Sequence, residues 1–466
     1  MVLYDKGNRL KRIFMKVILS GCGNVGTAIL QSLIKEKHDI VVIDTDPQVT
    51  REVSNRFDVL TICGNGASIE ILEEAGAKNA DLFISITSSD EYNMLACFVA
   101  KKMGTPNTVA RIRNSEYNNK SFDFVKDELG LSITINPEQL TAQTLFNILN
   151  LPSATNVETF SASEMEMIEI EALENSKVLG TPLFELRKKS PYKFLVCLVE
   201  RDGKVYIPNG SFTINAGDKI GLFTSKADAP SLLKMFGFEQ KPINSIMIIG
   251  ASRIAHYLAT LLLDAKNSVK VIDKDEQKCI QFAEKLDKAT IVNGNGINQE
   301  LLVEEGILNT DAFIALTGKD EDNVLMSIFA KNKSVPKTIT KIKSEEILSL
   351  SKELELDTAI SPKHLVADLI VSYARALESS KNSKIETLYR LFDGTAEAAE
   401  FKILHSFKHT NVPIKDLNIR NDVLVAGIVR GSETIIPCGE DVFRIGDKVI
   451  IITAGKTVYD LVDVIG

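Results

Sequence analysis

Residues 16–26 of this chain read KVILSGCGNVG, and this stretch decides the fold. The apolar run before Gly21 is typical of a buried strand, and Val25, Ile29 and Leu33 continue at the four-residue spacing of a helix. The pattern G-x-G-x-x-G lies between that strand and that helix. A glycine-rich turn in this position predicts a parallel α/β sheet.

Strands and helices keep alternating as far as residue 136. The strand-like runs are KVILSG, DIVVID, LTIC, LFISIT and TVARIR, and a helical pattern follows each of the first four. This βαβ succession predicts a parallel sheet with helices on both faces.

The chain is also a tandem repeat. The block GNGASIEILEEAGAKNADLFISIT begins at Gly64 and matches GNGINQELLVEEGILNTDAFIALT from Gly294, which sets an offset of 230 positions. Upstream, Gly21 pairs with Gly250, and the offset there is 229. Because the offset is nearly constant, we expect two copies of one architecture.

Each half changes character after its parallel sheet. The second part carries strands around hairpin-like turns at Asp202-Gly203 and Gly217-Asp218, matched by Arg430-Gly431 and Gly446-Asp447, which is typical of a small α+β lobe. A helical segment that opens with a proline precedes each lobe. We therefore predict an α/β protein with two tandem parallel-sheet domains, each followed by a lobe. The expected segments are an N-terminal extension (1–14), parallel-sheet domain 1 (15–136), a crossover helix (137–155), lobe 1 (156–240), parallel-sheet domain 2 (246–361), a second crossover helix (362–383) and lobe 2 (384–466).

Composition and charge narrow the class of protein. The net charge of -8, with both signs interspersed, argues against a nucleic-acid face. No apolar run reaches the roughly 18 residues of a membrane helix, so we expect a cytoplasmic protein. Met15 directly precedes the first strand and is an alternative start. The six cysteines lack C-x-x-C spacing, and we expect them to be reduced.

The glycine turn of the first half predicts a nucleotide site. Gly21 permits a tight turn, Gly23 lets the backbone approach a pyrophosphate, and Gly26 lets the helix pack against the strand. Free N–H groups at the helix N-terminus favour a bound phosphate. The candidate residues of this turn are Gly21, Cys22, Gly23, Asn24, Val25 and Gly26.

Asp44 ends the second strand, with Thr45 after it. A carboxylate in this position accepts hydrogen bonds from a ribose diol and repels a 2′-phosphate, which favours NAD or NADH over the phosphorylated dinucleotide. The same geometry can hold the ribose of ATP or ADP, so the pattern alone does not choose between them.

Further candidates follow the later strands of this sheet. The Gly64-Asn65-Gly66-Ala67 turn is expected beside the adenine, and Thr87-Ser88 near the phosphates or the second ribose. Arg111 and Arg113 are placed to pair with phosphate; the alternative is that they form ion pairs within an oligomer.

The second half keeps only part of this pattern. Its turn, from Gly250 to Ala255, has one glycine, and Ser252 stands where a pyrophosphate would approach. Lys341 and Lys343 replace the two arginines and cannot form a planar fork. The sequence leaves open whether this half binds a ligand, and a mononucleotide suits it better than a dinucleotide. The candidates are Gly250, Asp273, Gly294 and Asn295.

Five motifs together resemble the RCK (KTN) domain: KVILSGCGNVG, VVIDTDP, ITSSDEYNMLACFVAKKMG, ARIRNSEY and INPE. Two such Rossmann domains, each followed by an RCK-C lobe, resemble the TrkA family across residues 15 to 466. Departures are Asn65, where an acidic residue is expected, and the glycine-poor second turn.

The resemblance implies a nucleotide-sensing regulatory subunit of a potassium uptake system. It implies a homo-oligomer, generally a tetramer, docked at the inner face of the membrane on a TrkH-type potassium transporter and modulated by NAD(H) and adenine nucleotides. It implies that this chain carries no pore. No residue is singled out as catalytic or as a metal ligand, and the sequence leaves open whether a divalent ion binds between the lobes.

Two other classes fit less well. An NAD-dependent dehydrogenase needs a positioned acid or base beside the nicotinamide, and the five histidines of this chain occupy no matched positions in the two halves. A redox-sensing repressor needs a basic recognition helix, which the sequence lacks.

Overall fold

The computed structural model describes residues 15–118, 123–160, 164–238, 241–351, 353–377, 383–431, 433–455, 458 and 460–465. The expected extension at residues 1–14 lies outside this part of the chain. Within it, no helix is long and apolar enough to cross a membrane.

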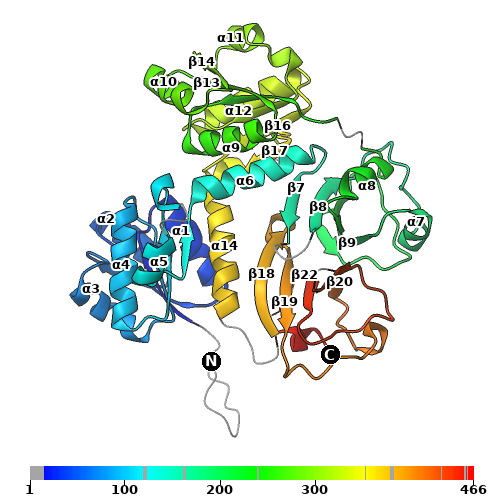
Figure 1. Ribbon diagram of the computed structural model, residues 1–466, viewed down its shortest axis with the longest axis horizontal. Helices are drawn as coiled ribbons and strands as arrows, with labels where there is room; N and C mark the ends of the chain where they lie inside the picture. The colour runs from blue at the N-terminus through cyan, green and yellow to red at the C-terminus, as the bar shows by residue number, and fades with distance from the viewer. Residues whose placement is uncertain are drawn as a thin grey trace. The chain divides into compact units, whose positions relative to one another are not determined.

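The first half opens with a parallel sheet of strand order β3-β2-β1-β4-β5-β6. Its central strands are almost fully buried, since helices cover both faces (Figure 1). The strand order reverses between β1 and β4. Open α/β sheets bind their ligands at such a switch point. The strands are β1 (Lys16–Ser20), β2 (Asp39–Asp44), β3 (Leu60–Cys63), β4 (Leu82–Ser85), β5 (Asn107–Arg111) and β6 (Ile133–Ile135). The helices are α1 (Asn24–Lys35), α2 (Pro47–Arg56), α3 (Ile69–Glu74), α4 (Asp90–Met103), α5 (Asp123–Leu129) and α6 (Pro137–Asn150).

The second half repeats this sheet with the order β14-β13-β12-β15-β16-β17. The expected fold class is therefore confirmed for both parallel sheets. The strands are β12 (Ser245–Ile249), β13 (Ser268–Asp273), β14 (Thr290–Asn293), β15 (Ala312–Ala315), β16 (Lys337–Lys341) and β17 (Thr358–Ile360). The helices are α9 (Arg253–Asp264), α10 (Glu276–Lys285), α11 (Gln299–Glu304), α12 (Asp320–Asn332), α13 (Glu345–Ser349) and α14 (Pro362–Leu377).

Each lobe is built on an antiparallel sheet, with the orders β10-β9-β11-β8-β7 and β18-β19-β22-β20-β21. The first lobe comprises β7 (Asn156–Thr159), β8 (Met165–Glu171), α7 (Leu183–Lys189), β9 (Phe194–Arg201), β10 (Lys204–Tyr206), β11 (Lys219–Ser225) and α8 (Ala229–Met235). The second comprises β18 (Ser383–Leu391), β19 (Ala396–Ile403), β20 (Val423–Arg430), β21 (Glu433–Ile435) and β22 (Lys448–Ala454). The segment boundaries that we expect from the sequence stay a prediction.

The two turns expected in the first lobe differ in kind. Asp202 and Gly203, at φ 52° and 73°, form a true hairpin between β9 and β10. Gly217-Asp218 instead leads into β11, whose neighbours are β8 and β9, so the expected hairpin there is wrong. Asp218 has a different structural role, since its buried carboxylate accepts two hydrogen bonds from Arg201, at 2.8 and 2.7 Å. Arg430 and Asp447 repeat this pair in the second lobe.

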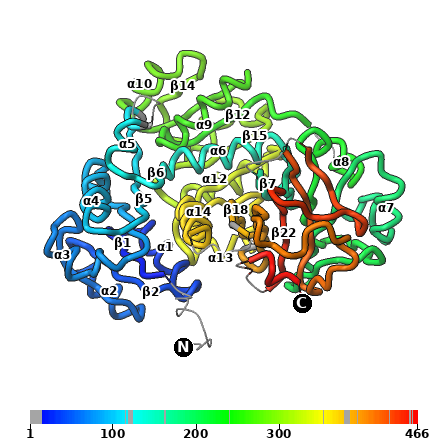
Figure 2. Tube along the Cα trace, turned by 60° about the horizontal axis from the view of Figure 1, so that its bottom comes forward, coloured from blue at the N-terminus to red at the C-terminus, as the bar shows by residue number. Residues whose placement is uncertain are grey.

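The two lobes share one hydrophobic core. Buried side chains from both, among them Phe160, Phe223, Phe392 and Ile450, form a single cluster. The Tyr389 hydroxyl donates to the Thr159 carbonyl at 2.5 Å. Figures 1 and 2 both show β7 of the first lobe beside β18 of the second. The lobes therefore join the two halves of the chain.

Each crossover helix groups, over most of its length, with the parallel sheet of the other half of the chain. The chain divides into two compact units, and residues 362–374 of α14 group with the first parallel sheet. From Thr141 onward, α6 belongs to the other unit, together with the second parallel sheet and both lobes. The Lys337 ammonium group, which is almost fully buried, donates to the Ala154 carbonyl at 2.9 Å and so ties the end of this crossover to the second sheet.

Candidate functional site

The glycine turn after β1 has the geometry that a phosphate site needs. Gly21 has a φ of 93°, a backbone conformation that residues with a side chain rarely adopt. A Cβ on Gly26 would lie 2.2 Å from the Gly21 carbonyl oxygen, so only glycine allows this close approach. Gly23 faces open space, and no side chain caps the N-terminus of α1. The free N–H groups of this helix are therefore available to an anion.

Asp44 ties the end of β2 to this turn. Its two carboxylate oxygens accept hydrogen bonds from the Cys22 N–H at 2.7 Å and from the Asp46 N–H at 3.0 Å. Thr45 beside it is exposed. Each carboxylate oxygen can accept a further hydrogen bond, so a ribose diol can still bind here.

The loop after β3 approaches the same strand end. Asn65 accepts a hydrogen bond from the Ala67 N–H at 2.9 Å, which closes a tight turn. A Cβ on Gly66 would lie 2.4 Å from the Ser20 hydroxyl at the end of β1. Gly66 thus lets this loop lie directly against the end of β1, whereas Gly64 makes room for the Ile71 side chain, 2.5 Å from the position of its Cβ.

Thr87, which precedes Ser88 in the loop after β4, is held by Asn93. The fully buried Asn93 side chain accepts from the Thr87 N–H and hydroxyl, both at 2.8 Å, and donates to the carbonyls of Thr87 and Arg111. It also accepts from the Ser85 hydroxyl at 3.0 Å. One amide side chain therefore joins the loop to two neighbouring strands.

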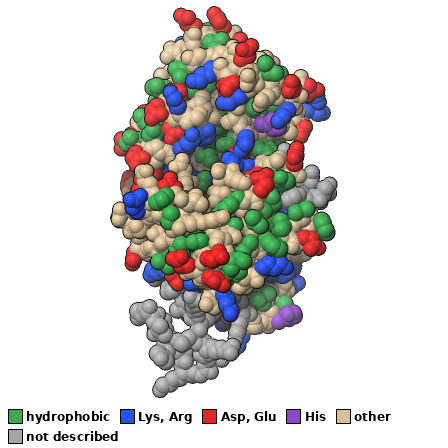
Figure 3. Space-filling view, turned by 90° about the vertical axis from the view of Figure 1, so that its left-hand side faces the viewer, with side chains coloured by type: hydrophobic (Ala, Val, Ile, Leu, Met, Phe, Trp, Pro, Cys, Tyr) green, Lys and Arg blue, Asp and Glu red, His purple; other side chains and the backbone are tan. Residues whose placement is uncertain are grey.

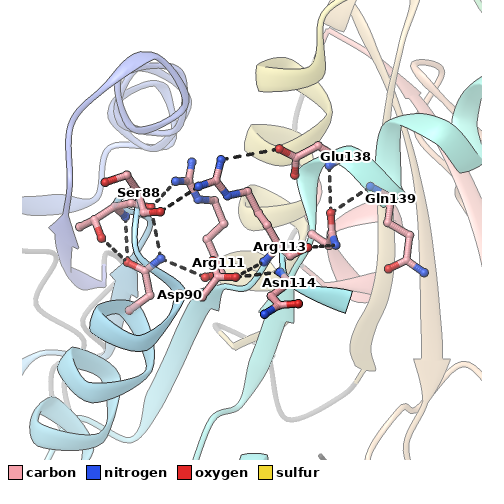
Figure 4. A network of polar contacts seen from close by, with 10 residues as sticks. Ser88, Asp90, Arg111, Arg113, Asn114, Glu138 and Gln139 are labelled. Carbon is pink, nitrogen blue, oxygen red and sulfur yellow. Dashed lines mark hydrogen bonds and ion pairs between the residues drawn. The ribbon is translucent and has the colours of Figure 1, made fainter. Parts of the chain in front are cut away.

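Arg111, the last residue of β5, and Arg113, two residues after it, approach the same loop (Figure 4). The Arg111 guanidinium donates to the Thr87 carbonyl, and that of Arg113 donates to the Ser88 carbonyl at 2.8 Å. Arg113 also lies 3.8 Å from the carboxylate of Glu138, in the first turn of α6. Both arginines thus position the loop, while the predicted pairing with phosphate stays a prediction.

Asn93 and Asp90 support the site, although neither was expected there from the sequence. The Asp90 carboxylate accepts from the N–H groups of Arg113 and Asn114, at 2.8 and 2.7 Å. Asn323 and Asp320 repeat these bonds in the second half. Their recurrence at one offset was the available signal, because buried polar side chains are kept where they satisfy backbone groups.

The second half contains a pocket of 320 Å³ at the matching strand ends. Asp273 again accepts from the turn, here from the Ala251 N–H at 2.6 Å. Gly250, Asp273 and Asn295 all line the pocket, whereas Gly294 is not among its lining residues. The Ser252 hydroxyl caps α9 by accepting from the Ala255 N–H at 3.3 Å, so this helix end satisfies one of its own N–H groups.

Lysines replace both arginines here. The loop contact at Gly318 matches that at Ser88, whereas the other contact moves to Leu316, one residue before the position that matches Thr87. Lys341 donates to the Leu316 carbonyl at 3.0 Å, and Lys343 to the Gly318 carbonyl at 2.7 Å. Burial lowers the pKa of Lys341 to about 8, with a smaller contribution from the charge of Lys343. The structure therefore brings the predicted residues of each half to one sheet edge, and their ligands stay predictions.

Comparisons with known proteins cover nearly the whole chain. The model of the TrkA-N domain matches residues 17–137 and 246–362, and that of the TrkA-C domain matches residues 167–237 and 400–466.

Curated relatives align over almost their full length. A Trk system potassium uptake protein TrkA homolog from Archaeoglobus fulgidus is 31% identical over 439 residues, which cover 94% of this chain and 97% of that protein. The Trk system potassium uptake protein TrkA from Halomonas elongata is 30% identical, with 95% and 96% covered.

Solved structures show the same fold at lower identity. The RCK domain of GsuK superposes with a TM-score of 0.63 at 15% identity and covers 97% of this chain and 94% of that chain. The GsuK channel bound to NAD superposes with the same TM-score and identity, covering 97% of this chain and 78% of that one. At this identity the likeness shows the fold alone.

Proposed function

The chain belongs to the TrkA family, and on that premise we propose that it is a nucleotide-sensing regulatory subunit of a potassium uptake system. In this proposal NAD(H) binds at the first parallel sheet, and adenine nucleotides modulate the same protein. A TrkH-type membrane transporter responds to the resulting conformational change. The subunit would lie at the inner face of the membrane through that partner.

The observation that carries the proposal is the open turn of the first half. Gly23 has no atom within 4 Å of the position that a side chain would occupy, and α1 has no side-chain cap. A pyrophosphate can therefore approach the backbone and the positive end of the helix. Asp44 lies beside this turn, and its charge favours a ribose diol over a 2′-phosphate.

A chain of contacts leads from this site to the crossover helix. The Ser88 carbonyl is bound by Arg113, whose guanidinium lies 3.8 Å from Glu138 in α6 (Figure 4). Asn136 donates to the Arg113 carbonyl and accepts from the Glu138 N–H at 3.1 Å. A ligand that shifts the Thr87-Ser88 loop would move the start of α6, which leads to the first lobe.

An oligomer makes a modest selectivity sufficient. Moving an equilibrium from 1:99 to 99:1 takes ~5.5 kcal/mol of differential binding energy. In the tetramer that we propose, four equivalent sites would each need to favour one state by ~1.4 kcal/mol, about tenfold in affinity.

The test is calorimetric titration of the full chain with NADH, NAD, ATP and ADP, together with an assay for nicotinamide turnover. We expect NADH to bind without turnover. The variant Gly23→Val places a side chain in the open space of the turn and should abolish binding while the protein still folds. Asp44→Ala should weaken binding, whereas the matched control Asp273→Ala should leave NADH affinity at the first site unchanged.

Two outcomes would overturn the proposal. Unchanged NADH affinity in Gly23→Val would show that the turn does not hold the pyrophosphate. Turnover of the nicotinamide with a small substrate would instead favour the dehydrogenase. Conductance of the reconstituted membrane partner, measured with and without NADH, then tests gating directly.

A further inference from the structure

One fully buried carboxylate lies on the face of β19 that packs against the first lobe. Side chains of a strand alternate between its two faces, and Glu400 follows Ala398, which belongs to the core that the two lobes share. Across the sheet, Glu400 lies opposite Ile450, and Ile450 lies opposite Gly427. A Cβ on Gly427 would lie 2.9 Å from the Phe223 ring of the first lobe. The row of residues that contains Glu400 therefore packs against the other lobe.

The carboxylate of Glu400 lacks the contacts that a buried charge needs. Its side chain is fully buried, yet neither oxygen has a hydrogen-bond partner among the residues that the structure describes. The Lys448 ammonium group lies 3.5 Å from it, and the same group forms an ion pair with Glu386 of β18. Burial of an ionised carboxylate without hydrogen bonds is costly, and such a group takes up a proton instead.

The charges at this site balance only if one carboxyl group is protonated. Lys448 supplies one positive charge, whereas Glu386 and Glu400 supply two negative charges when both are ionised. Burial raises the pKa of Glu400 most, attraction by Lys448 lowers it in part, and the charge of Glu386 raises it again. Glu386 is partly exposed, so the proton belongs on the fully buried Glu400.

Three further titratable groups surround this face of the sheet. Tyr389 of β18 and the exposed Lys402 of β19 lie on it, and Glu158 belongs to β7 of the first lobe. Burial raises the pKa of Tyr389, and the charges of Glu158 and Glu400 raise it further, so the phenol stays neutral. Water screens the charge of Lys402. None of the three supplies the hydrogen bond that Glu400 lacks in the described part of the chain.

The matching carboxylate of the first lobe has a hydrogen bond that Glu400 does not have. Glu169 lies opposite Gly221 of β11, as Glu400 lies opposite Ile450, and Gly221 matches Ile450 in the tandem repeat. Glu169 is half-buried, and its carboxylate accepts from the Phe392 N–H of the second lobe at 3.3 Å. A bond between the lobes thus favours the ionised form of Glu169, and Glu400 has no such bond.

We propose that Glu400 is a proton-dependent switch for the association of the two lobes. Closing the lobes around Glu400 takes up a proton on its carboxylate, and Lys448 then neutralises Glu386 alone. Separating the lobes brings water to the carboxylate, and the proton is released. The inference goes beyond the proposed function, because it needs no nucleotide and makes the joining of the two halves depend on pH.

The direction of this dependence follows from where protons bind. Glu400 has a raised pKa when the lobes are closed and an ordinary one, about 4.3, when water reaches it. Between these two values the closed state binds more protons than the open state. Closure is therefore strongest below about pH 4.3 and weakens as the pH rises to the raised value. A fall in pH holds the lobes together, and a rise in pH loosens them.

Cys197 is a natural reporter of this opening. It is fully buried in the core that the lobes share, whereas Cys97 is fully buried in the first parallel sheet. Both thiols of the full chain are labelled with dithiodipyridine, and peptide mass spectrometry then gives the labelling rate at each cysteine. These rates measure how often each region opens. Comparing wild type and variant at the same pH removes the effect of pH on the thiols themselves.

Three variants separate the contributions. Glu400→Gln keeps the shape of the side chain and cannot ionise. Glu386→Gln leaves Lys448 to neutralise Glu400 alone, so that no proton is needed for charge balance. Glu171→Gln removes an exposed carboxylate of the first lobe and is the control of equal charge change.

The expected result is a pH dependence that only the two carboxylates of the site remove. The labelling rate of Cys197 in the wild type, divided by that in Glu400→Gln, should rise about fivefold or more from about pH 5.5 to about pH 8, since one proton changes an opening equilibrium by up to about tenfold per pH unit. Glu171→Gln should repeat this rise. In Glu386→Gln the rise should be less than about twofold, and the ratio at Cys97 should stay within about twofold throughout.

The proposal fails if the wild type and Glu400→Gln show the same pH dependence at Cys197. It also fails if Glu386→Gln keeps the full response of the wild type, which tests the charge balance without altering Glu400. Loss of the response in Glu171→Gln, or an equal response at Cys97, would show that the proton acts elsewhere. Since NADH takes no part in this measurement, failure of the proposed function would leave its outcome unchanged.

Discussion

The turn after β1 and the turn after β12 occupy the same place in two copies of one fold, yet they treat the adjoining helix differently. Gly23 leaves α1 without a side-chain cap, whereas Ser252 caps α9 from within the protein. An uncapped helix N-terminus has unsatisfied donors, and a capped one has fewer. The first turn is therefore suited to bind an external anion, whereas the second already satisfies one helix N–H group within the protein.

The buried polar residues that support the loops after β4 and β15 differ less between the two halves than the turns do. Asn93 and Asn323 hold the loops after β4 and β15 with nearly the same bonds, and Asp90 and Asp320 do likewise. The two copies thus share the buried polar scaffold and differ in the residues at the turns. Buried polar groups are costly to leave unpaired, while exposed ones vary at little cost.

The scaffold itself offers the largest expected effect. Asn93→Leu should lower the free energy of unfolding by about 3 kcal/mol, because it leaves several buried donors and acceptors unpaired. Asn323→Leu should cost about 1 kcal/mol less, since Ala315 stands where Ser85 donates to Asn93. Urea denaturation of the two variants checks this order, and equal losses would contradict it.

The exchange of arginine for lysine predicts a pH dependence. Burial lowers the pKa of Lys341 to about 8, below that of an unfolded lysine. Between about pH 8 and pH 10.5 the unfolded state binds more protons, so this residue makes the folded state more stable as the pH rises, by on the order of 2 kcal/mol. Lys341→Arg, which restores the residue of the first half, should lose this dependence. A constant difference between the two proteins from pH 7 to pH 10 would be the contrary result.

The turn can be altered toward its counterpart. Gly23→Ser fits the open space and supplies a cap like that of Ser252, so stability should stay the same or rise by up to about 1 kcal/mol. NADH affinity should fall about tenfold, because the new side chain crowds the pyrophosphate and competes for a helix N–H. Fluorescence titration with NADH measures the second effect, and an unchanged affinity would contradict the comparison.

The cap of the second turn should have the smallest effect. Ser252→Ala removes the acceptor for the Ala255 N–H and should cost about 1 kcal/mol of stability. Ser252→Gly should cost only a few tenths, since glycine is tolerated at this position. Thermal unfolding compares both variants with the wild type, and a melting temperature of Ser252→Ala equal to that of the wild type would show that the bond contributes nothing.

Much of the site was accessible from the sequence because its determinants are local. The glycine pattern, the carboxylate that ends the second strand and the loops after later strands all follow from the order of strands and helices. The roles of Arg111 and Arg113 were not accessible in this way. Their carbonyl partners, on Thr87 and Ser88, lie about two dozen residues away in the chain and meet them only through the sheet.

The sequence by itself determined the period of each element, the duplication and the conformations that only glycine adopts, such as the φ of 93° at Gly21. These depend on neighbours along the chain and on side-chain alternation. The tertiary structure decided that residues 362–374 group with the first sheet, that both lobes contribute to one hydrophobic cluster and that three of the residues lining the pocket of the second half are lysines. Such features arise from contacts between distant segments, which no local pattern encodes.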